Sequence, residues 1–426
     1  MPMSDTTLLR HSARPHIAVV LGTRPEYLKL APVVLELRQH RELLDTTVIL
    51  TGQHRELLSG LPELFDMADC RQLGVANQQP DLASLTAALL TALDAQFARE
   101  RPSAVVVQGD TTTAFAAALA AFYRQIPVAH VEAGLRTYRL DQPFPEELNR
   151  QMVGRIATWH FPPTRDADQQ LAAESVPAAA RQVTGNTIVD TLQLVLTKKL
   201  PNDYAERLLP HEAPELAQAL ARRPRGQRRP LVLLTVHRRE NQGPQLGEFF
   251  AMIRRVAARH PELDLVYPYH LNPAVRQVAL EQLADLPGVH LMPPLPYRAM
   301  LFLMQQVDFA LSDSGGLQEE LPSFGKPLLV LRTSTERPEV VAAGMAQLVG
   351  LQPAVVEPAL EDLLAAAARG EDPQWFHRGP NPFGDGRAAQ RIVARLLTDL
   401  VDLPPRPARG QSAVTAAVRA VGSNAS

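Results

Sequence analysis

Cysteine is almost absent from this sequence of 426 residues, which contains only Cys70. A single cysteine excludes a disulfide framework and any metal site built from several cysteines. The sequence also lacks an HExxH motif, an aspartate-rich run and a closely spaced histidine pair, so we expect no metal. No GxGxxG motif follows the first predicted strand, which argues against a dinucleotide, and we expect no cofactor. The lack of disulfides fits a reducing compartment, and we predict a cytoplasmic protein.

Long apolar runs are missing as well. No segment reaches the roughly 18 consecutive apolar residues that a membrane-spanning helix needs. Residues 1–15 are polar and lack the apolar middle part of a signal peptide. The net charge of −2 gives no general attraction to nucleic acid or to acidic membranes. We therefore expect neither nucleic acid nor a membrane as a partner.

Hydrophobic residues make up 46% of the chain and charged residues 21%, as in soluble globular proteins. A chain of this length is too long for one ordinary core, so we expect two domains. Short β-branched runs alternate with longer helical patterns, and this series occurs twice, on either side of a polar, proline-rich region at 198–230. Strands are predicted at 17–21, 47–50, 104–107, 128–131, 158–161, 231–235, 263–267, 289–292, 309–311 and 328–331.

Strands separated by a dozen or more residues form parallel sheets through βαβ crossovers. We therefore predict an α/β protein with two Rossmann-like domains that face a central cleft. The predicted boundaries are 16–185 with 386–403 for the N-terminal domain, 186–385 for the C-terminal domain, and 1–15 and 404–426 for two disordered tails. We expect a hinge near Gly185 and Asn186, and a helix at 388–397 that returns to the first domain.

Carboxylic acids stand at or shortly after the ends of two predicted strands. Asp110 follows the run 104–107, Glu132 follows 128–131, and Glu146 comes shortly afterwards. Ligands bind outside the carboxyl ends of parallel strands, so we expect these acids to crowd around one crevice. Crowded acids repel one another's charge, so at least one should have a raised pKa and exchange protons near neutral pH.

Helix starts follow several of these strand ends. The alanine-rich run 114–123 predicts a helix that the hydroxyls of 111–113 can cap. In the motif GTRPE, Arg24 and then Lys29 occupy the first turns of another helix, with a proline suited to its first position. Cations oppose the macrodipole there unless an anion binds, so these residues indicate an anion site. The alternative is two solvated cations on an exposed turn.

The motif SDSGGLQEE follows the strand at 309–311. Its two glycines, Gly315 and Gly316, let backbone N–H groups approach a ligand, and Ser314 can donate a hydroxyl or cap the helix. This arrangement suits a diphosphate, and Glu320 could accept hydrogen bonds from a pair of ribose hydroxyls. An isolated DSGG pattern can also be an ordinary tight turn.

Two further residues of the second half point toward the expected cleft. His237 ends the strand at 231–235, although a histidine there can also bond a backbone carbonyl. Arg337 follows the strand at 328–331 and could balance phosphate charge. The alternative for Arg337 is a surface ion pair with Glu336 or Glu339.

Taken together, these motifs resemble the non-hydrolysing UDP-N-acetylglucosamine 2-epimerases, enzymes of the glycosyltransferase-B fold. The resemblance runs from about residue 17 to residue 392. Its segments are GTRPEYLKLAPVV, TGQHRELL, QGDTTTAFAAALAAFY, HVEAGLRT, PFPEELNRQ, VTGNTIVDTL, TVHRREN, YPYHLNP, LSDSGGLQEELPSFGKP, TERPE and NPFGDG. Enzymes of this family interconvert UDP-GlcNAc and UDP-ManNAc by eliminating UDP to 2-acetamidoglucal and adding it back.

By position, the resemblance implies roles for individual residues. The implied catalytic residues are Asp110, Glu132, Glu146 and His237. The implied UDP-binding residues are Arg24, Lys29, Ser314, Gly315, Gly316, Glu320 and Arg337, with His237 also close to UDP. The residues that match a second, activating UDP-GlcNAc site are Gln53, His54, Arg238 and His270. The implied partner is a UDP-amino sugar, and the implied assembly is a homodimer.

The sequence departs from the family pattern at three positions. Leu295 and Met300 replace a glutamine and a phenylalanine that flank the uracil, and Ala88 stands where an arginine of the activating site is expected. Activation by substrate and the use of a modified UDP-amino sugar therefore stay open. Three different functions also fit the same motifs, namely a hydrolysing epimerase that releases ManNAc and UDP, a glycosyltransferase, and an inactive nucleotide-sugar-binding regulator.

Overall fold

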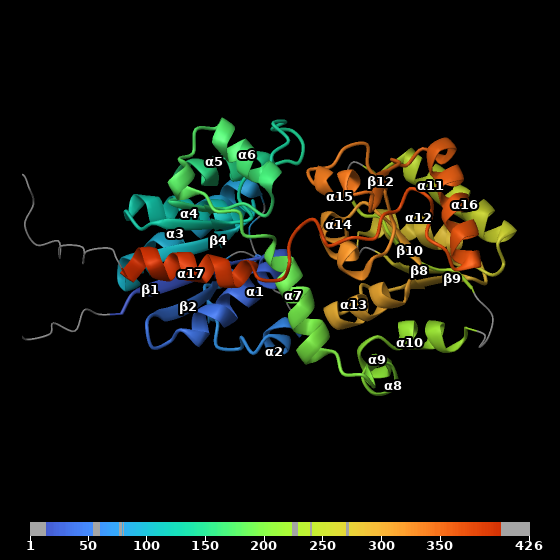
Figure 1. Ribbon diagram of the computed structural model, residues 1–426, viewed down its shortest axis with the longest axis horizontal. Coiled ribbons are helices and arrows are strands. Elements are labelled where there is room, and N and C mark those ends of the chain that lie inside the picture. The colour runs from blue at the N-terminus through green and yellow to red at the C-terminus, as the bar shows by residue number, and fades with distance from the viewer. Residues whose placement is uncertain are drawn as a thin grey trace, which may run out of the picture.

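The computed structural model describes residues 14–53, 60–75, 79, 81–223, 229–238, 241–269 and 272–401. They form two parallel β-sheets of six strands each, with helices around both sheets (Figure 1). We call the first sheet and its helices the N-lobe, and the second sheet and its helices the C-lobe. The tails predicted at 1–15 and 404–426 lie outside the described residues, apart from Arg14 and Pro15.

The N-lobe sheet has the strand order β3-β2-β1-β4-β5-β6, and all neighbouring strands are parallel. Its strands are β1 (His16–Leu21), β2 (Asp45–Leu50), β3 (Arg71–Gln72), β4 (Ala104–Gln108), β5 (Val128–Val131) and β6 (Trp159–Phe161). Val19 pairs with Val48 on one side and with Val106 on the other. This is the Rossmann order, in which the chain reverses direction between the first and fourth strands.

Helices cover both faces of the N-lobe sheet because side chains alternate along each strand. The helices are α1 (Arg24–Gln39), α2 (Leu61–Leu64), α3 (Leu82–Glu100), α4 (Thr112–Tyr123), α5 (Glu146–Ile156), α6 (Arg165–Ala173) and the 3-10 helix η2 (Ala178–Ala180). Val19 and Leu21 of β1 share a core with α1, whereas Ala18 and Val20 share a core with α3 and α4.

The C-lobe repeats this plan, with the strand order β12-β11-β10-β7-β8-β9. Read from the other edge, this is again the Rossmann order. Its strands are β7 (Leu231–Thr235), β8 (Asp264–Pro268), β9 (Val289–Met292), β10 (Phe309–Ser312), β11 (Leu328–Val330) and β12 (Ala346–Leu348). Its helices are α8 (Tyr204–Arg207), α9 (Leu209–Glu212), α10 (Pro214–Ala221), α11 (Pro244–Arg259), α12 (Pro273–Leu283), α13 (Tyr297–Gln306), α14 (Gly315–Glu320), η5 (Leu321–Phe324), α15 (Pro338–Ala342) and α16 (Pro353–Arg369).

The chain passes between the lobes twice, and the two passages touch. Gly185 precedes α7 (Thr187–Leu194), which continues as the π-helix η3 (Val195–Lys199) and packs against both α1 and α14. The Asn186 N–H donates to the Phe383 carbonyl at 2.6 Å, just before the chain returns as α17 (Ala388–Val401). α17 lies on the N-lobe beside α1 (Figure 1). The predicted hinge and domain boundaries stay predictions.

The predicted fold class is confirmed. All ten predicted strands are present with ends within two residues, and the predicted helices start at Thr112 and Ala388. Thr111 caps α4 as expected, since its hydroxyl accepts from the Ala114 N–H at 3.0 Å. The sequence analysis missed β3 and β12, which are short edge strands and carry little hydrophobic pattern.

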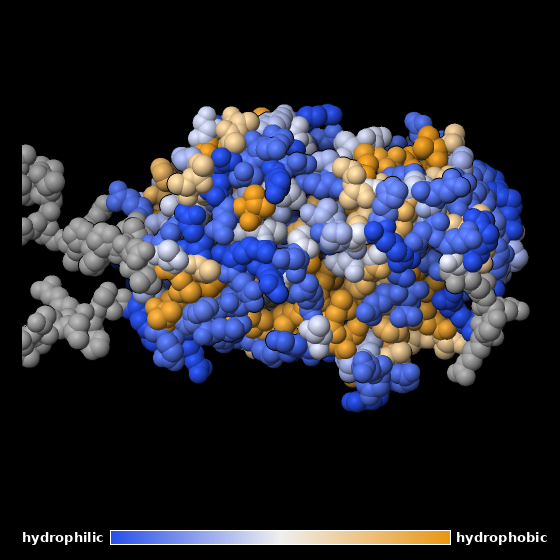
Figure 2. Space-filling view, viewed as in Figure 1, coloured by the Kyte–Doolittle hydropathy of each residue, from blue (hydrophilic) through white to orange (hydrophobic). Residues whose placement is uncertain are grey.

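The surface is mixed in character. Hydrophilic residues cover most of the face shown in Figure 2, with apolar residues between them. None of the helices in the described ranges is long and apolar enough to cross a membrane. One core cluster of buried apolar residues contains members from both lobes, so the lobes pack on each other through an apolar contact.

Candidate active site

The strand order of each sheet creates one switch point at its carboxyl edge. It lies between β1 and β4 in the N-lobe and between β7 and β10 in the C-lobe. Open α/β sheets bind ligands outside such points. The predicted site residues that follow these four strands are Arg24, Asp110, His237 and Ser314. Glu132 and Arg337 follow the neighbouring strands β5 and β11.

The turn after β1 packs closely on the start of α4. A Cβ atom on Gly22 would lie 2.3 Å from Thr113 Oγ1 and 2.4 Å from Thr51 Oγ1, so only glycine fits there. Thr113 also donates a hydrogen bond to Gln53 Oε1 at 2.8 Å. Gln53, predicted for the activating site, thus lies next to this turn.

A buried acid, Glu26, joins two of the turns. It forms a capping box with Thr23, whose N–H donates to Glu26 Oε2 at 2.7 Å, and it accepts from the Thr111 hydroxyl at 2.6 Å. Burial raises the pKa of Glu26 to about 6. Glu26 therefore ties the turn that carries Arg24 to the turn that carries Asp110. The sequence analysis missed it, although the T-x-x-E spacing is a known cap signal.

Arg24 is the first residue of α1 and faces the C-lobe. Burial lowers its pKa, and the charges of Glu320 and Tyr297 from the C-lobe oppose that shift. Within the described residues, the Arg24 guanidinium forms no hydrogen bond or ion pair. A cation at a helix N-terminus that makes no hydrogen bond or ion pair of its own is a favourable place for an anion.

Lys29, one turn further along α1, is held between two carboxylates. Its Nζ lies 2.8 and 2.7 Å from the oxygens of Glu132 and 2.8 Å from Glu319 of the C-lobe. The Lys29 side chain is only 8% exposed. Burial acts to lower the pKa of Lys29, but the two carboxylates raise it above the usual value. The alternative of a solvated surface cation is wrong for Lys29, and its UDP-binding role stays a prediction.

Glu132 stands in an unusual backbone conformation at the end of β5. Its φ of +61° is left-handed, which is uncommon outside glycine and is found at functional sites. Burial raises the pKa of Glu132, the charge of Glu319 adds to this, and Lys29 and Arg337 oppose it. A raised pKa among the acids was predicted from their mutual repulsion. The shift is present, but burial is its main cause.

Asp110 is held by two side chains of α5. Arg150 Nη2 donates to Asp110 Oδ2 at 2.5 Å, and Asn149 Nδ2 donates to the Asp110 carbonyl at 2.9 Å. Glu146, the first residue of α5, is half-buried, and burial followed by the Asp110 charge raises its pKa. The positive charge of Arg238, from the C-lobe, opposes that shift, so Glu146 faces the other lobe.

The first turn of α14 is covered by a buried arginine. A Cβ atom on Gly315 would lie 2.8 Å from Arg337 Nη1, which explains a glycine at this position. Arg337 also donates to Glu319 at 2.6 Å and to Glu336 at 2.5 Å. Its side chain is 10% exposed, so the expected pair with Glu336 exists, but not on the surface. Ser314 occupies the N-cap of α14 without a side-chain cap bond.

Glu320, the last residue of α14, is a buried acid that faces Arg24. Its Oε1 accepts from the Tyr297 hydroxyl at 3.1 Å. Burial, reinforced by the charge of Glu319, raises the pKa of Glu320 to about 7. Beside it, Gly316 has open space, since a Cβ there would meet only Ser314 Oγ at 3.7 Å.

His237 and Arg238 are held by Asp313, the residue after β10. The His237 Nδ1 atom lies 3.2 Å from Asp313 Oδ1, and the Arg238 N–H donates to Oδ2 at 2.8 Å. Arg238 also pairs with Glu336 at 3.6 Å. The remaining predicted residues of the activating site, His54 and His270, lie outside the described residues.

The two lobes thus bring most of the predicted residues to one place. Lys29 and Glu132 of the N-lobe contact Glu319 and Arg337 of the C-lobe, and the charge of Arg337 also acts on Arg150, which holds Asp110. The site residues that sequence reasoning missed are Glu26, Arg150, Asp313 and Glu319. Arg150 could have been found because it follows Glu146 and Glu147 of α5 at the spacing of one helical turn. Glu26 could have been found from its cap pattern. Nothing in the sequence singles out Glu319 from its neighbour Glu320.

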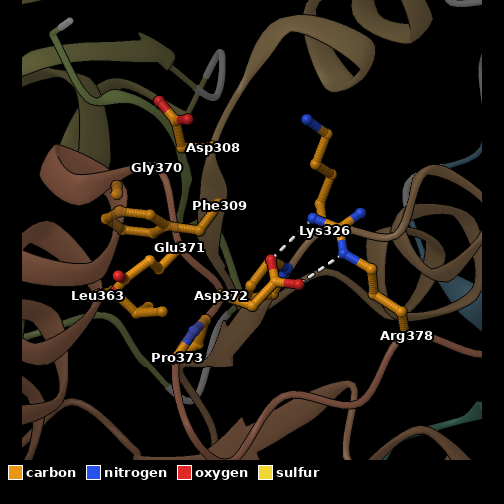
Figure 3. Close-up of a pocket in the computed structure, with 11 residues that line it drawn as sticks. Asp308, Phe309, Lys326, Leu363, Gly370, Glu371, Asp372, Pro373 and Arg378 are labelled. Carbon is orange, nitrogen blue, oxygen red and sulfur yellow. Dashed lines mark hydrogen bonds and ion pairs between the residues drawn. The ribbon is translucent and has the colours of Figure 1, made fainter.

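A small cavity of about 160 Å³ lies elsewhere in the C-lobe. It lies beside Phe309 and Pro327, where β10 and β11 begin, and Arg378 and Asp372, which line it, form an ion pair at 2.5 Å (Figure 3). The amino ends of parallel strands are not where such sheets bind ligands. This cavity is therefore separate from the candidate site.

Known proteins resemble this chain over most of its length. The family model described as UDP-N-acetylglucosamine 2-epimerase matches residues 36–397. A UDP-N-acetylglucosamine 2-epimerase from Bacillus subtilis is 41% identical over 384 residues, which cover 89% of this chain and 94% of the relative. The crystal structure of UDP-GlcNAc 2-epimerase from Neisseria meningitidis bound to UDP-GlcNAc is 39% identical with a TM-score of 0.82, and the match covers 90% of this chain and 100% of that one.

The overall architecture extends beyond these relatives. The glycotransferase of kitacinnamycin is 15% identical with a TM-score of 0.54, over 90% of this chain and 100% of that one, so it shares the fold alone. Two facing Rossmann-like lobes are the glycosyltransferase-B fold that the sequence predicts. From the family match and the identity over most of its length, the chain belongs to the UDP-N-acetylglucosamine 2-epimerase family.

Proposed function

We propose that this protein interconverts UDP-GlcNAc and UDP-ManNAc by the non-hydrolysing route. The observation that carries the proposal is that Lys29, which is paired with Glu132, also contacts Glu319 of α14. This contact lies where the switch points of the two sheets face each other. Acids for proton transfer and donors for a diphosphate thus occupy one site. The names of the relatives support the same substrate.

The chemistry requires an acid and a base on opposite faces of the sugar. The hydrogen at C2 is weakly acidic, so its removal must accompany loss of the anomeric diphosphate. One carboxylate takes the proton, the C2–H electron pair forms the C1–C2 double bond, and the C1–O pair leaves with UDP. In the return direction a second acid gives its proton to the other face of C2, the electron pair of the C1–C2 double bond forms the new C2–H bond, and the UDP oxygen bonds to C1. We assign these transfers to Asp110, Glu132 and Glu146.

Departure of UDP requires positive charge and N–H donors on the leaving group. Arg24 forms no hydrogen bond or ion pair within the described residues, and Gly316 leaves open space beside the N-terminus of α14. We assign the diphosphate to these groups and to His237, and the ribose hydroxyls to Glu320. Lys29 and Arg337 already share Glu319, so we propose that they act on the diphosphate as part of that charged cluster.

Burial of the cluster supports retention of the intermediate. Lys29, Glu132 and Glu319 have side chains less than 10% exposed, and a site without water protects glucal and UDP from hydrolysis or escape. A hydrolysing epimerase, which releases ManNAc and UDP, is the second candidate. The homodimer, the cytoplasmic location and the activating site stay predictions.

The test is proton NMR of UDP-GlcNAc with the enzyme in deuterated water. We expect C2 of both nucleotide sugars to take up deuterium while UDP-ManNAc appears and free UDP does not accumulate. Accumulating UDP and ManNAc would favour the hydrolysing candidate, and C2 protons that stay in place would refute both.

A matched pair of variants tests the acids. Asp110→Asn should reduce C2 exchange by about 100-fold or more, the contribution of a general acid or base, while UDP still binds. Asp141→Asn, at an exposed loop position, should exchange like the unchanged enzyme. Full exchange by Asp110→Asn would remove Asp110 from the catalytic residues.

A further inference from the structure

His237 contacts a fully buried carboxylate from the neighbouring strand. Its Nδ1 atom lies 3.2 Å from Oδ1 of Asp313, which is 0% exposed, whereas the imidazole is 36% exposed. β7 and β10 pair directly, with Thr235 opposite Ser312, so the turns that carry His237 and Asp313 lie side by side. The sheet itself therefore holds an acid against the inner edge of the imidazole.

The other oxygen of Asp313 is fixed by three donors. Oδ2 accepts from the N–H groups of His237 at 2.9 Å and Arg238 at 2.8 Å, and from Asn241 Nδ2 at 2.9 Å. Oδ1 is buried and makes no hydrogen bond within the described part of the chain. A buried acceptor without a donor is costly, and His237 Nδ1, at 3.2 Å, is the side-chain nitrogen in contact with Oδ1.

The partner of one ring nitrogen decides what the other can do. A hydrogen on Nδ1 that faces a carboxylate fixes the tautomer and the ring orientation, and it thereby sets the direction in which Nε2 lies. The same turn faces the acids of the N-lobe, since the charge of Arg238 acts on Glu146. Asp313 thus contacts the inner edge of the His237 ring, and the turn that carries the ring faces the candidate active site.

We propose that Asp313 is a positioning residue for His237, which holds hydrogen on Nδ1 so that Nε2 meets the diphosphate of the substrate. The part of this statement that concerns the diphosphate rests on the proposed 2-epimerase function. When the C1–O electron pair leaves with UDP, a protonated ring donates its Nε2–H to the departing oxygen, and no proton has to leave His237. A hydrogen bond to the departing oxygen stabilises the negative charge that develops there.

The first test reads the tautomer and does not depend on activity. Nitrogen NMR of the full-length protein labelled at histidine, at a pH where the ring is neutral, should show His237 with hydrogen on Nδ1; the His237→Gln variant identifies the signal. Asn241→Ala, which removes a donor to Oδ2 and leaves Oδ1 in place, should keep that tautomer. Asp313→Asn should lose it. If His237 of the unchanged protein carries hydrogen only on Nε2, the proposal is overturned. This outcome can be read even if Asp313→Asn does not fold.

The second test separates positioning from a general structural role. Asp313→Asn should lower kcat by about 100-fold, near the lower end for an acid or base group, with a smaller change in KM. In a His237→Gln background the same substitution should change kcat by less than about threefold, because the two residues act as one unit. An equal loss in both backgrounds would refute a role through His237. Absence of 2-epimerase activity in the unchanged enzyme would defeat the proposed function, while the NMR result would still decide the tautomer.

Discussion

Replacing Lys29 with methionine would remove the cation that two buried carboxylates share. Lys29 Nζ lies within 2.8 Å of oxygens of Glu132 and Glu319, whose side chains are 4% and 1% exposed. Methionine fills a similar volume, so the main change is electrostatic. Arg337 would remain as the neighbouring cation, but it lies 3.8 Å from Glu132 and is shared with Glu336. Two buried acids would then face each other with too little positive charge.

The expected loss is large because breaking a buried ion pair leaves an unpaired charge. Such losses are about 3–5 kcal/mol. At roughly 2–4 °C per kcal/mol for a domain of this size, the Tm should fall by about 10 °C. The variant can reduce the cost if Glu132 takes up a proton, since burial already raises the pKa of Glu132 above its ordinary value of 4.5. The unfolded state loses its proton at lower pH, so the defect should grow as pH rises from about 4.5 through the raised pKa.

The assay is thermal unfolding at several pH values, with a matched control. Lys199 forms an ion pair of the same 2.8 Å length with Asp66, whose side chain is 74% exposed. Lys199→Met should therefore cost less than about 1 kcal/mol. Adding Glu319→Gln to Lys29→Met should restore part of the lost stability, since it removes one of the unpaired charges. A Lys29→Met protein as stable as Lys199→Met would refute the argument that this cluster is charged and buried.

Three further outcomes follow from other contacts. Arg24→Ala should weaken UDP binding by about 10- to 100-fold in calorimetry, the loss of a charged hydrogen bond, whereas Arg14→Ala, at an exposed pair with Asp45, should not; equal affinities would defeat the anion site. Because the pKa of Glu320 is raised to about 7, its carboxylate is protonated below that pH, so UDP affinity should rise between about pH 6 and pH 8 in the unchanged enzyme and much less in Glu320→Gln. Asp190→Ala removes the carboxylate that accepts from the Ala388 and Ala389 N–H groups at the start of α17, and it should lower stability by about 0.5–2 kcal/mol without altering UDP affinity; a change in affinity would show that α17 also shapes the site.

Strand positions could be predicted because the buried strands carry a strong local signal. The runs of β1, β4 and β7 are almost wholly apolar and end in turn residues, as fully buried parallel strands do. β3 consists of two residues, both of them exposed, and β12 consists of only three residues. Neither strand is long enough to show a pattern that differs from that of a loop. Their place at the sheet edges depends on pairing with β2 and β11, which the local sequence does not contain.

The site residues could be located by strand ends, but their partners could not. Asp110 and Glu132 follow predicted strands, so their presence at one edge of the sheet follows from topology. The sequence suggested that these acids repel one another. In the structure each acid forms an ion pair with a cation instead: Arg150 pairs with Asp110, and Lys29 pairs with Glu132. Ion pairs of this kind depend on helices packed from distant parts of the chain.

The ion pairing between the two lobes is the feature that is hardest to predict from the sequence. Lys29 and Glu319 are separated by nearly three hundred residues, and their contact exists only because two sheets with the same strand order face each other at their switch points. Glu319 and Glu320 are adjacent in sequence, yet one pairs with Lys29 and Arg337 while the other bonds Tyr297. Successive residues of a helix point about 100° apart, so neighbouring acids meet different surroundings. This difference gives them opposite pKa shifts: the two cations hold the pKa of Glu319 below its usual value against the effect of burial, whereas burial raises that of Glu320. A motif therefore locates the acids, but the packing of the lobes decides which of them is charged.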